Sequence, residues 1–435
     1  MKARLAQDQA AVDGTSTKAN AYMKSLYKGR FDFIVQTFNE DRFIVDSELN
    51  QYLTEVLQNI QKTNPEWPQD VSVYVYRSST PNAICFGEGT IAFSLSLLSR
   101  LENEDQVAYV LCHELAHHYG KHADIKVEDL TRLNFDKELS KQVKEIKSTT
   151  YGQYTKLKDL MQGLELSLNY HSREKEFEAD SIGLQLFLNT SYQTLAPVRT
   201  MEILDSVDQS IYRSPLDLRK YFNFKGYSYK ESWEQYTKSD TWYAKKNEVD
   251  SLKTHPGCKK RSLALQRQLT RANRWPDEQV SSKDEVYSFI RTTSEFEMVE
   301  SEYHFKGYGK ALFQAIMMLE QFPDNAYLHG MIGKCLYKLY ESQKNHVLGK
   351  VLELPDPRFN ENYDRFLTFF HRLRLSELEN LAYYYVTNQD EKYFSDEDFL
   401  YATWLCSRLS VSKLDPDSVL EELQTKFPDS RYLNK

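Results

Sequence analysis

The pattern of apolar positions predicts a helix followed by strands early in the chain. Apolar residues recur every three or four positions between residues 47 and 62, as they do on one face of an amphipathic helix. Pro65 and Pro68 then interrupt the chain. Residues 71–76 alternate apolar and polar side chains, which is typical of a strand, and a second strand at 83–86 is expected to pair with it.

A more uniformly apolar stretch at residues 107–111 predicts a buried helix that continues through residue 118. Asn103 and two acidic residues precede this stretch. An asparagine side chain can cap a helix at that position, and acidic residues are favoured near the positive end of the helix dipole. We therefore expect the helix to begin directly after Asn103.

The segments that follow differ in character. Charged residues dominate 121–170, where scattered apolar positions predict one or two solvated helices, and another helix is expected at 195–204. Residues 205–250 are rich in aromatic side chains without a clear period. They would form either a lid or substrate-contacting insertion or, as we favour, a satellite cluster packed on the domain that surrounds them.

Beyond residue 276 one helical pattern follows another. Ala311 lies twelve residues before Pro323, which is the spacing found in tetratricopeptide repeats. Residues 427–429 repeat the Phe-Pro-Asp sequence of residues 322–324. Degenerate repeats of this kind stack helix pairs into a concave surface that suits peptides or proteins. A series of unrelated helices is the alternative.

These patterns together predict an α+β fold that is mostly helical. A lead-in segment at 1–45, with short strands or a helix, would precede a domain with a small sheet at 46–275. A helical, tetratricopeptide-like domain would then occupy 276–435. A chain of 435 residues is long enough for two or three such domains.

The composition excludes several classes of protein. A net charge of −8 and the lack of a dense basic patch argue against nucleic-acid binding. The five cysteines are scattered and form no C-x-x-C pair, so no disulfide framework is expected. No window approaches the roughly 18 apolar residues that a membrane-spanning helix requires, so no membrane-spanning segment is expected.

The candidate chemistry lies in the helix predicted at 107–118, which contains the pattern H-E-x-x-H. His113 and His117 are four residues apart, so both imidazoles leave the same face of the helix. Two neutral imidazoles in this arrangement can bind one zinc ion, and Glu114 can take a proton from the water on that metal. A helix with surface histidines is the alternative. The neighbouring His118 and His122 are expected to be solvated.

A second helical segment supplies a third ligand. Glu176 and Asp180 are also four residues apart and share one face of a helix. Glu176 can complete a His-His-Glu site that leaves a fourth position for water. Asp180, one turn further on, can accept the remaining N–H of a zinc-bound imidazole and fix its tautomer.

The chain resembles the gluzincin metallopeptidases, which include the CaaX prenyl protease, the heat-shock protease HtpX and the periplasmic, repeat-bearing BepA. The family pattern of H-E-x-x-H followed by E-x-E-A-D stands at 113–117 and 176–180. Two further matches lie at 82–89 and at Thr254-His255-Pro256 with Arg261. The resemblance covers about residues 45–275 and is closest to the soluble, BepA-like members with C-terminal repeats.

This resemblance implies one Zn2+ per chain, held by His113, His117 and Glu176, with Asp180 orienting His113. It also makes 82–89 a strand beside the cleft. The residues that follow would be the cleft-edge strand, whose unpaired backbone groups can bind an extended substrate. An ordinary hairpin is the alternative. The proposed substrate-binding residues are Thr90, Ile91, Ala92 and Phe93.

His255 has three possible roles within the matched His-Pro element. It could be a fourth zinc ligand that plugs the open position, as the resemblance to the BepA group implies. It could instead donate a hydrogen bond to the oxyanion in catalysis, with Arg261 as a second positive group. A histidine held by its own turn at the start of a helix is the alternative to both.

The expected function is that of a zinc-dependent endopeptidase in protein quality control, with Glu114 as the general base. Peptides or unfolded proteins would be its substrates, and the helical repeats would bind substrate or a protein partner. The alternative is a chaperone or assembly adaptor that acts through the repeats, with a latent zinc site plugged by His255. By family resemblance the protein is expected in the periplasm or cell envelope if its N-terminus is processed, and in the cytoplasm if the chain is complete.

Overall fold

The computed structural model describes residues 2–12, 16–148, 173–206, 211–212, 214–234, 257–274, 285–356 and 359–433. The chain divides into two units. Unit 1 comprises residues 1–208 and 248–295, and unit 2 comprises residues 209–247 and 296–435. Unit 1 combines a small sheet with helices, whereas the described part of unit 2 is almost entirely helical, which confirms the predicted fold class.

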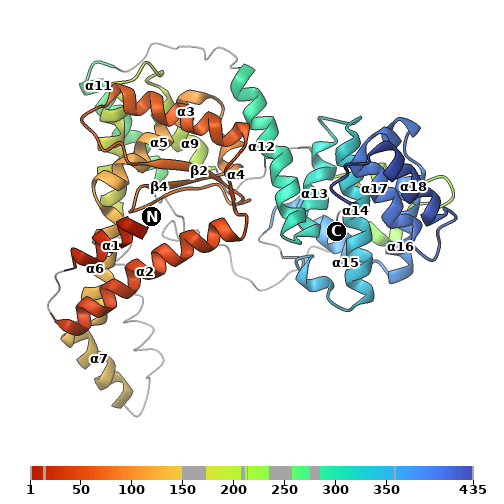
Figure 1. Ribbon diagram of the computed structural model, residues 1–435, viewed down its shortest axis with the longest axis horizontal. Coiled ribbons are helices and arrows are strands. Elements are labelled where there is room, and N and C mark those ends of the chain that lie inside the picture. Colours follow the sequence, from red (N-terminus) through yellow and green to blue (C-terminus); the bar gives the residue numbers. More distant parts are fainter. Residues whose placement is uncertain are drawn as a thin grey trace. The chain divides into compact units, whose positions relative to one another are not determined.

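A four-stranded mixed sheet lies between helices in unit 1 (Figure 1). The strand order is β1-β2-β4-β3. β4 pairs with β2 in parallel and with β3 in the antiparallel direction, and β1 pairs antiparallel with β2. The strands are β1 Phe43–Ile44, β2 Ser72–Tyr76, β3 Ala83–Phe86 and β4 Thr90–Ser94.

This order corrects two expectations. β3 pairs with β4 and not with the strand at 71–76, because residues 87–89 turn the chain directly back, with Gly89 at a φ of 98°. β4 has a neighbour on each side and is buried along its whole length. Thr90, Ile91, Ala92 and Phe93 therefore cannot form the cleft-edge strand, and β3 is the outermost of the described strands on this side of the sheet.

The two faces of the sheet pack against different helices. Helix α2 (Thr17–Asn39) covers one face, where it packs against Phe43, Tyr74 and Ala92. Helices α3 (Glu48–Thr63) and α5 (Glu104–Tyr119) lie on the other face (Figure 1). Since side chains alternate across a strand, each strand contributes to both cores.

The two best-defined helix predictions are confirmed. The helix predicted at 47–62 is α3, and all the apolar positions that predicted it are buried. Asn103 caps α5, because its side-chain oxygen accepts the backbone N–H of Gln106 at 3.1 Å. The segment 31–35, expected as a strand or a helix, lies within α2.

The remaining helices of unit 1 include the predicted helix near 195–204 and two helices in the charged segment. None of the described helices is both long and apolar enough to span a bilayer. Helix α12 (Glu285–His304) begins in unit 1 and ends in unit 2. The others are α1 Lys2–Ala10, α4 Leu95–Leu98, α6 His122–Asn134, α7 Lys137–Ser148, a helix at 173–188, α9 Ala196–Asp205 and α11 Cys258–Arg271.

Helix 173–188 approaches α5 closely because a glycine lies at the contact. A Cβ atom placed at Gly183 would lie 3.1 Å from both the Cα and the backbone nitrogen of His113. These are backbone atoms inside a buried helix, so they cannot move aside like the end of a flexible side chain. Gly183 therefore sets the distance at which the two helices pack.

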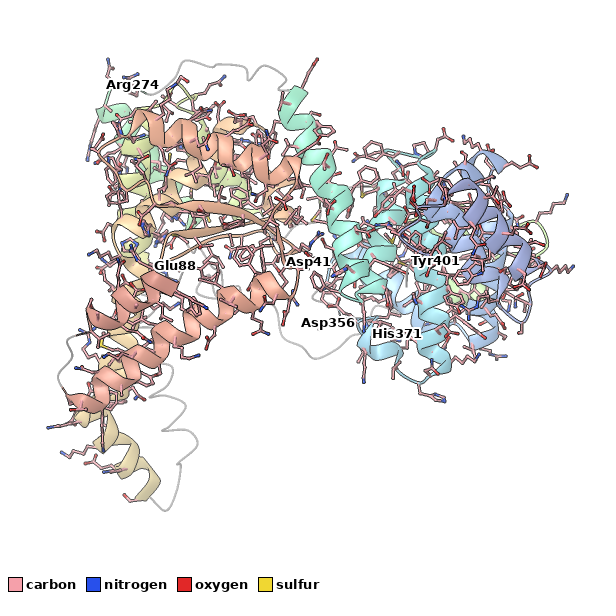
Figure 2. All side chains as sticks on the ribbon, viewed as in Figure 1. Asp41, Glu88, Arg274, Asp356, His371 and Tyr401 are labelled. Atoms are coloured by element: carbon pink, nitrogen blue, oxygen red, sulfur yellow. The ribbon has the colours of Figure 1, made fainter. Side chains whose placement is uncertain are left out.

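Unit 2 is built around α14, which packs against α13, α16 and α17. Tyr401 on α17 stacks on Tyr432, with ring centroids 3.7 Å apart, so the described C-terminal residues pack on the same helices (Figure 2 labels Tyr401). The helices are α10 Leu218–Phe222, α13 Tyr308–Met318, α14 Ala326–Lys344, α15 Glu361–Arg372, α16 Leu375–Thr387, α17 Glu397–Ser407 and α18 Pro416–Lys426.

The described part of the aromatic-rich segment, residues 214–234, belongs to the core of unit 2. Phe222 and Trp233 are buried there, and both rings contact Phe369, at centroid distances of 5.7 and 5.8 Å. For these residues the expected packing on the surrounding peptidase-like domain is wrong. Large rings without a period bury their area against whichever apolar surface reaches them, and here that surface comes from α15 and α16.

Two glycine substitutions test the close helix contact. Gly29 lies in an exposed part of α2 with nothing near its missing Cβ, so Gly29→Ala is expected to raise the free energy of unfolding by about 0.5–1 kcal/mol. Gly183→Ala places a methyl group against the backbone of His113 and is expected to lower it by about 1–3 kcal/mol. Urea unfolding followed by circular dichroism measures both. Equal stabilisation by the two variants would contradict the close contact.

Candidate metal centre

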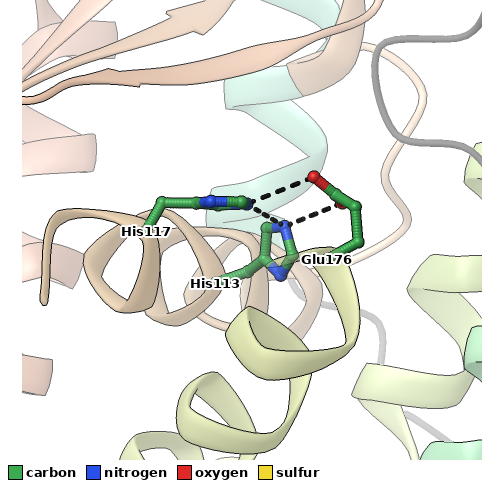
Figure 3. A group of neighbouring side chains, drawn as sticks. All are labelled: His113, His117 and Glu176. Atoms are coloured by element: carbon green, nitrogen blue, oxygen red, sulfur yellow. Dashed lines mark hydrogen bonds and ion pairs between the residues drawn. The ribbon is translucent and has the colours of Figure 1, made fainter. Parts of the chain in front are cut away.

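Three side chains from two helices converge on one point in unit 1. α5 presents His113 and His117 on one face, and helix 173–188 presents Glu176 opposite them (Figure 3). The two Nε2 atoms are 3.0 Å apart. Glu176 Oε2 lies 3.5 Å from His113 Nε2, and its Oε1 lies 3.4 Å from His117 Nε2. Within the described residues, these three form a group whose donor atoms lie close enough to share one metal ion.

The donor set fits zinc. Imidazole nitrogens and a carboxylate oxygen are the ligands that hydrolytic zinc sites use, and three protein ligands leave one position for water. His113 and Glu176 are buried, whereas His117 is half-buried at the outer side of the group. The position that the protein ligands leave open would therefore lie on the side of His117, the most exposed of the three.

Asp180 lies directly behind His113. Its Oδ1 is 3.1 Å from His113 Nδ1, and it also accepts a hydrogen bond from the hydroxyl of Tyr109 at 3.2 Å. Arg261 donates to both carboxylate oxygens at 2.7 Å. Burial alone would raise the pKa of Asp180, but the Arg261 guanidinium outweighs it and holds that pKa well below its usual range. Asp180 is therefore a permanent anion.

The anions beside His113 change its protonation. Burial alone would lower the pKa of His113, but hydrogen bonds to Asp180 and Glu176 outweigh that effect and raise the pKa to about 9. Without a metal, His113 is thus protonated at neutral pH, with one N–H toward each carboxylate. A metal ion at this place must displace a proton from the Nε2 atom.

Arg261 does not have the surroundings expected of a residue that stabilises an oxyanion. It is only 1% exposed, its Nε and Nη2 donate to Asp180, and its Nη1 lies 2.7 Å from Glu176 Oε2. A guanidinium whose donors are committed to two buried carboxylates cannot also serve as the second positive group at an oxyanion. This corrects the expected catalytic role. Arg261 instead clamps Glu176 and Asp180 onto the same helix face.

The expected exposure of two further histidines is also wrong. His118 and His122 are each only 8% exposed. Lys121, at a φ of 50°, turns the chain between α5 and α6 and brings His122 back over His117, where their Nδ1 atoms are 2.8 Å apart. His122 Nε2 lies 3.4 Å from Glu178 Oε2. The sequence analysis did not predict the contact between His117 and His122. The only signal for it in the sequence was a histidine nine residues after His113.

Glu114 lies beside β3, the outermost of the described strands on its side of the sheet. Its Oε2 accepts the backbone N–H of Cys85 in β3 at 2.8 Å, and its side chain is buried. The backbone N–H of Ser94 donates to the carbonyl of Asn82, so Asn82, Ile84 and Phe86 direct their backbone groups toward β4. Cys85, between them, directs its backbone N–H and C=O away from β4. The segment expected beside the cleft thus borders Glu114. His255 lies outside the described residues.

The comparisons with known proteins agree with this geometry. The profile of peptidase family M48 matches residues 45–269, which include both helices of the candidate metal centre and β3. No curated protein is significantly similar to the chain. The match spans more than half of the sequence. The chain therefore belongs to peptidase family M48, a family of zinc metallopeptidases.

Proposed function

We propose that this protein is a zinc-dependent endopeptidase that hydrolyses peptide bonds of unfolded protein substrates. The observation that carries the proposal is the convergence of His113, His117 and Glu176 beside a buried Glu114 that accepts the backbone N–H of Cys85 in β3. His113, His117 and Glu176 would hold one Zn2+. When bound, the metal would lower the pKa of a water molecule and polarise the scissile carbonyl.

The residues behind the ligands would fix their orientation. Asp180 accepts the Nδ1–H of His113, which leaves the Nε2 of that ring as the donor toward the metal position. His122 can do the same for His117 through the contact between their Nδ1 atoms. Arg261 holds Asp180 and Glu176 together. One buried cation therefore supports Glu176, a proposed ligand, and also Asp180, which orients the proposed ligand His113.

Glu114 would act as the general base. It would take the proton of the attacking water and later give it to the leaving amine. The hydrogen bond from Cys85 N to Oε2 fixes the orientation of the carboxylate, and the other oxygen, Oε1, would exchange the proton. His255 lies outside the described residues and is assigned no step.

An extended peptide would lie beside the outer edge of β3, close to Glu114, which accepts the Cys85 N–H. Only an unfolded segment can present an extended backbone there, which supports a role in protein quality control. The helices of unit 2 would hold substrate or a protein partner, as in a tetratricopeptide-like domain.

Replacing Glu114 separates metal binding from catalysis. Glu114→Gln is expected to keep one zinc per chain while cleavage of unfolded casein falls by about 10²–10⁴-fold, because the amide cannot accept the proton. Metal content by mass spectrometry and cleavage on gels measure the two effects. Glu138→Gln, an exposed change on α7, is the control and should retain activity. Undiminished cleavage by Glu114→Gln would refute the assigned base.

Zinc binding should depend on pH through His113. Its pKa is raised to about 9, so below pH 9 a proton competes with the metal for Nε2. The apparent zinc affinity of the chelator-treated protein is expected to rise by roughly tenfold per pH unit between pH 6.5 and 8.5. Competition with a chromophoric chelator of known proton dependence measures it. An affinity that stays constant over this interval would show that no proton leaves His113 when the metal binds.

A further inference from the structure

A pocket in unit 2 lies where the aromatic-rich segment 214–234 meets the helices α14 and α16. Its volume is about 360 Å³, which is within the range of ligand pockets in proteins. Residues 220–225, in and after α10, form one part of its wall. The connection from α13 to α14 and the end of α16 form the rest. All of its lining residues belong to unit 2, so the pocket is separate from the candidate metal centre.

Hydrogen bonds fix the buried side of this pocket. His329 on α14 lies with its Nε2 2.9 Å from the carbonyl oxygen of Pro323, which can only accept, so Nε2 carries the proton. Burial lowers the pKa of His329, so the ring is neutral and its Nδ1 accepts the hydroxyl hydrogen of Tyr385 at 2.8 Å. The ring of Tyr385 packs edge-on against that of Phe224, with centroids 6.2 Å apart. The buried side is therefore a rigid aromatic wall and carries no charge.

A tight turn holds a lysine at the exposed rim. Phe224 and Tyr227 exchange backbone hydrogen bonds of 3.1 and 3.2 Å, and Gly226, at a φ of 97°, allows the turn between them. Tyr227 stacks on Tyr384 of α16, with ring centroids 5.4 Å apart, so the turn is anchored on a helix that also lines the pocket. Lys225 lies in this turn, is exposed, and lines the pocket.

Among the described residues, the pocket carries one positive charge without a partner. Two lysines line it. Lys220 pairs with Glu320 at 2.7 Å, and the hydroxyl of Tyr221 donates to the same carboxylate oxygen. Lys225 has no carboxylate partner in the described part of the chain, and none of the described lining residues is acidic. In a chain with a net charge of −8, a pocket of this composition favours an anion.

Three side-chain amides also line the pocket. Asn388 donates from its Nδ2 to the carbonyl of Tyr384 at 2.9 Å, which leaves its Oδ1 as an acceptor. The Oδ1 of Asn223 accepts the backbone N–H of Tyr229 at 3.0 Å, which leaves its Nδ2 as a donor. Gln389 keeps both of its groups, because no described residue bonds to its side chain. Donors and acceptors side by side match the N–H and C=O groups of a peptide backbone.

We propose that this pocket binds the carboxyl-terminal end of a peptide or protein. The terminal carboxylate would pair with Lys225, and the amides would bind the backbone of the last residues. The wall of Phe224 and Tyr385 would contact an apolar or aromatic last side chain. A terminal carboxylate is attached directly to the backbone, so it fits a pocket that offers a cation and amides together. The inference specifies the partner-binding role proposed for unit 2 and is independent of the proposed peptidase chemistry.

Three labelled peptides test the inference. The first is Ser-Gly-Ser-Gly-Leu-Phe with a free carboxyl terminus, the second is its carboxyl-terminal amide, and the third ends in serine in place of phenylalanine. Binding to the Glu114→Gln protein is followed by fluorescence anisotropy. The first peptide is expected to bind about tenfold more tightly than the amide, which cannot form the ion pair. It is also expected to bind about tenfold more tightly than the third, which loses the contact with the aromatic wall.

Two variants locate the binding site in the pocket. Lys225→Gln and Gln389→Glu alter side chains without a partner among the described residues, so neither is expected to affect folding. Lys225→Gln should abolish the preference for the free carboxyl terminus. Gln389→Glu should weaken binding of the free-acid peptide by about tenfold through charge repulsion, with binding of the amide unchanged. Lys413→Gln removes an exposed lysine between α17 and α18 and is the control, which should retain the full preference.

The outcomes separate this inference from the peptidase function. Equal binding of the free acid and the amide, no binding of either, or an unchanged preference in Lys225→Gln overturns the inference. Unlabelled N-acetylphenylalanine that competes as well as the peptide would show that a small aromatic acid suffices, which would overturn the assignment to a chain end. A protein that cleaves no casein but still prefers the free-acid peptide loses the proposed peptidase function and keeps this binding site.

Discussion

The arrangement of the metal centre depends on the burial of one carboxylate, that of Asp180. An isolated ionised carboxylate inside a protein is strongly unfavourable, and here Arg261, Tyr109 and His113 together satisfy it. Arg261 also reaches Glu176, so the carboxylate, the guanidinium and two of the proposed metal ligands form one connected group. Removing either Asp180 or Arg261 would leave the other as a buried charge without its main partner. The group therefore joins helix 173–188, α5 and α11 in a single orientation.

Much of this centre could be predicted from local sequence. Helical spacing alone places His113 and His117 on one face, and it places Glu176 and Asp180 on another, because each pair lies within two turns of its own helix. The cap at Asn103 and the buried face of α3 follow from equally local rules. Helical spacing could not predict the close approach of α5 and helix 173–188, which Gly183 permits.

The errors arose where a residue's environment depends on distant parts of the chain. Strand pairing was misjudged because the turn at 87–89 pairs β3 with β4, the strand that follows it, and not with β2, the strand that precedes it. His122 was expected in solvent because nothing in its sequence shows that α6 folds back over His117. Arg261 was expected at the oxyanion because its two carboxylate partners lie over eighty residues earlier. The rings at 214–234 likewise pack on helices far along the chain.

We propose that two helices bring two imidazoles and one carboxylate onto a single metal ion. Crystallography of the zinc-loaded protein, with diffraction data collected on both sides of the zinc absorption edge, tests this most directly. We expect one anomalous peak per chain, at about 2.0–2.2 Å from His113 Nε2, His117 Nε2 and a carboxylate oxygen of Glu176. A peak bound elsewhere, or a Glu176 side chain turned away from the metal, would contradict it.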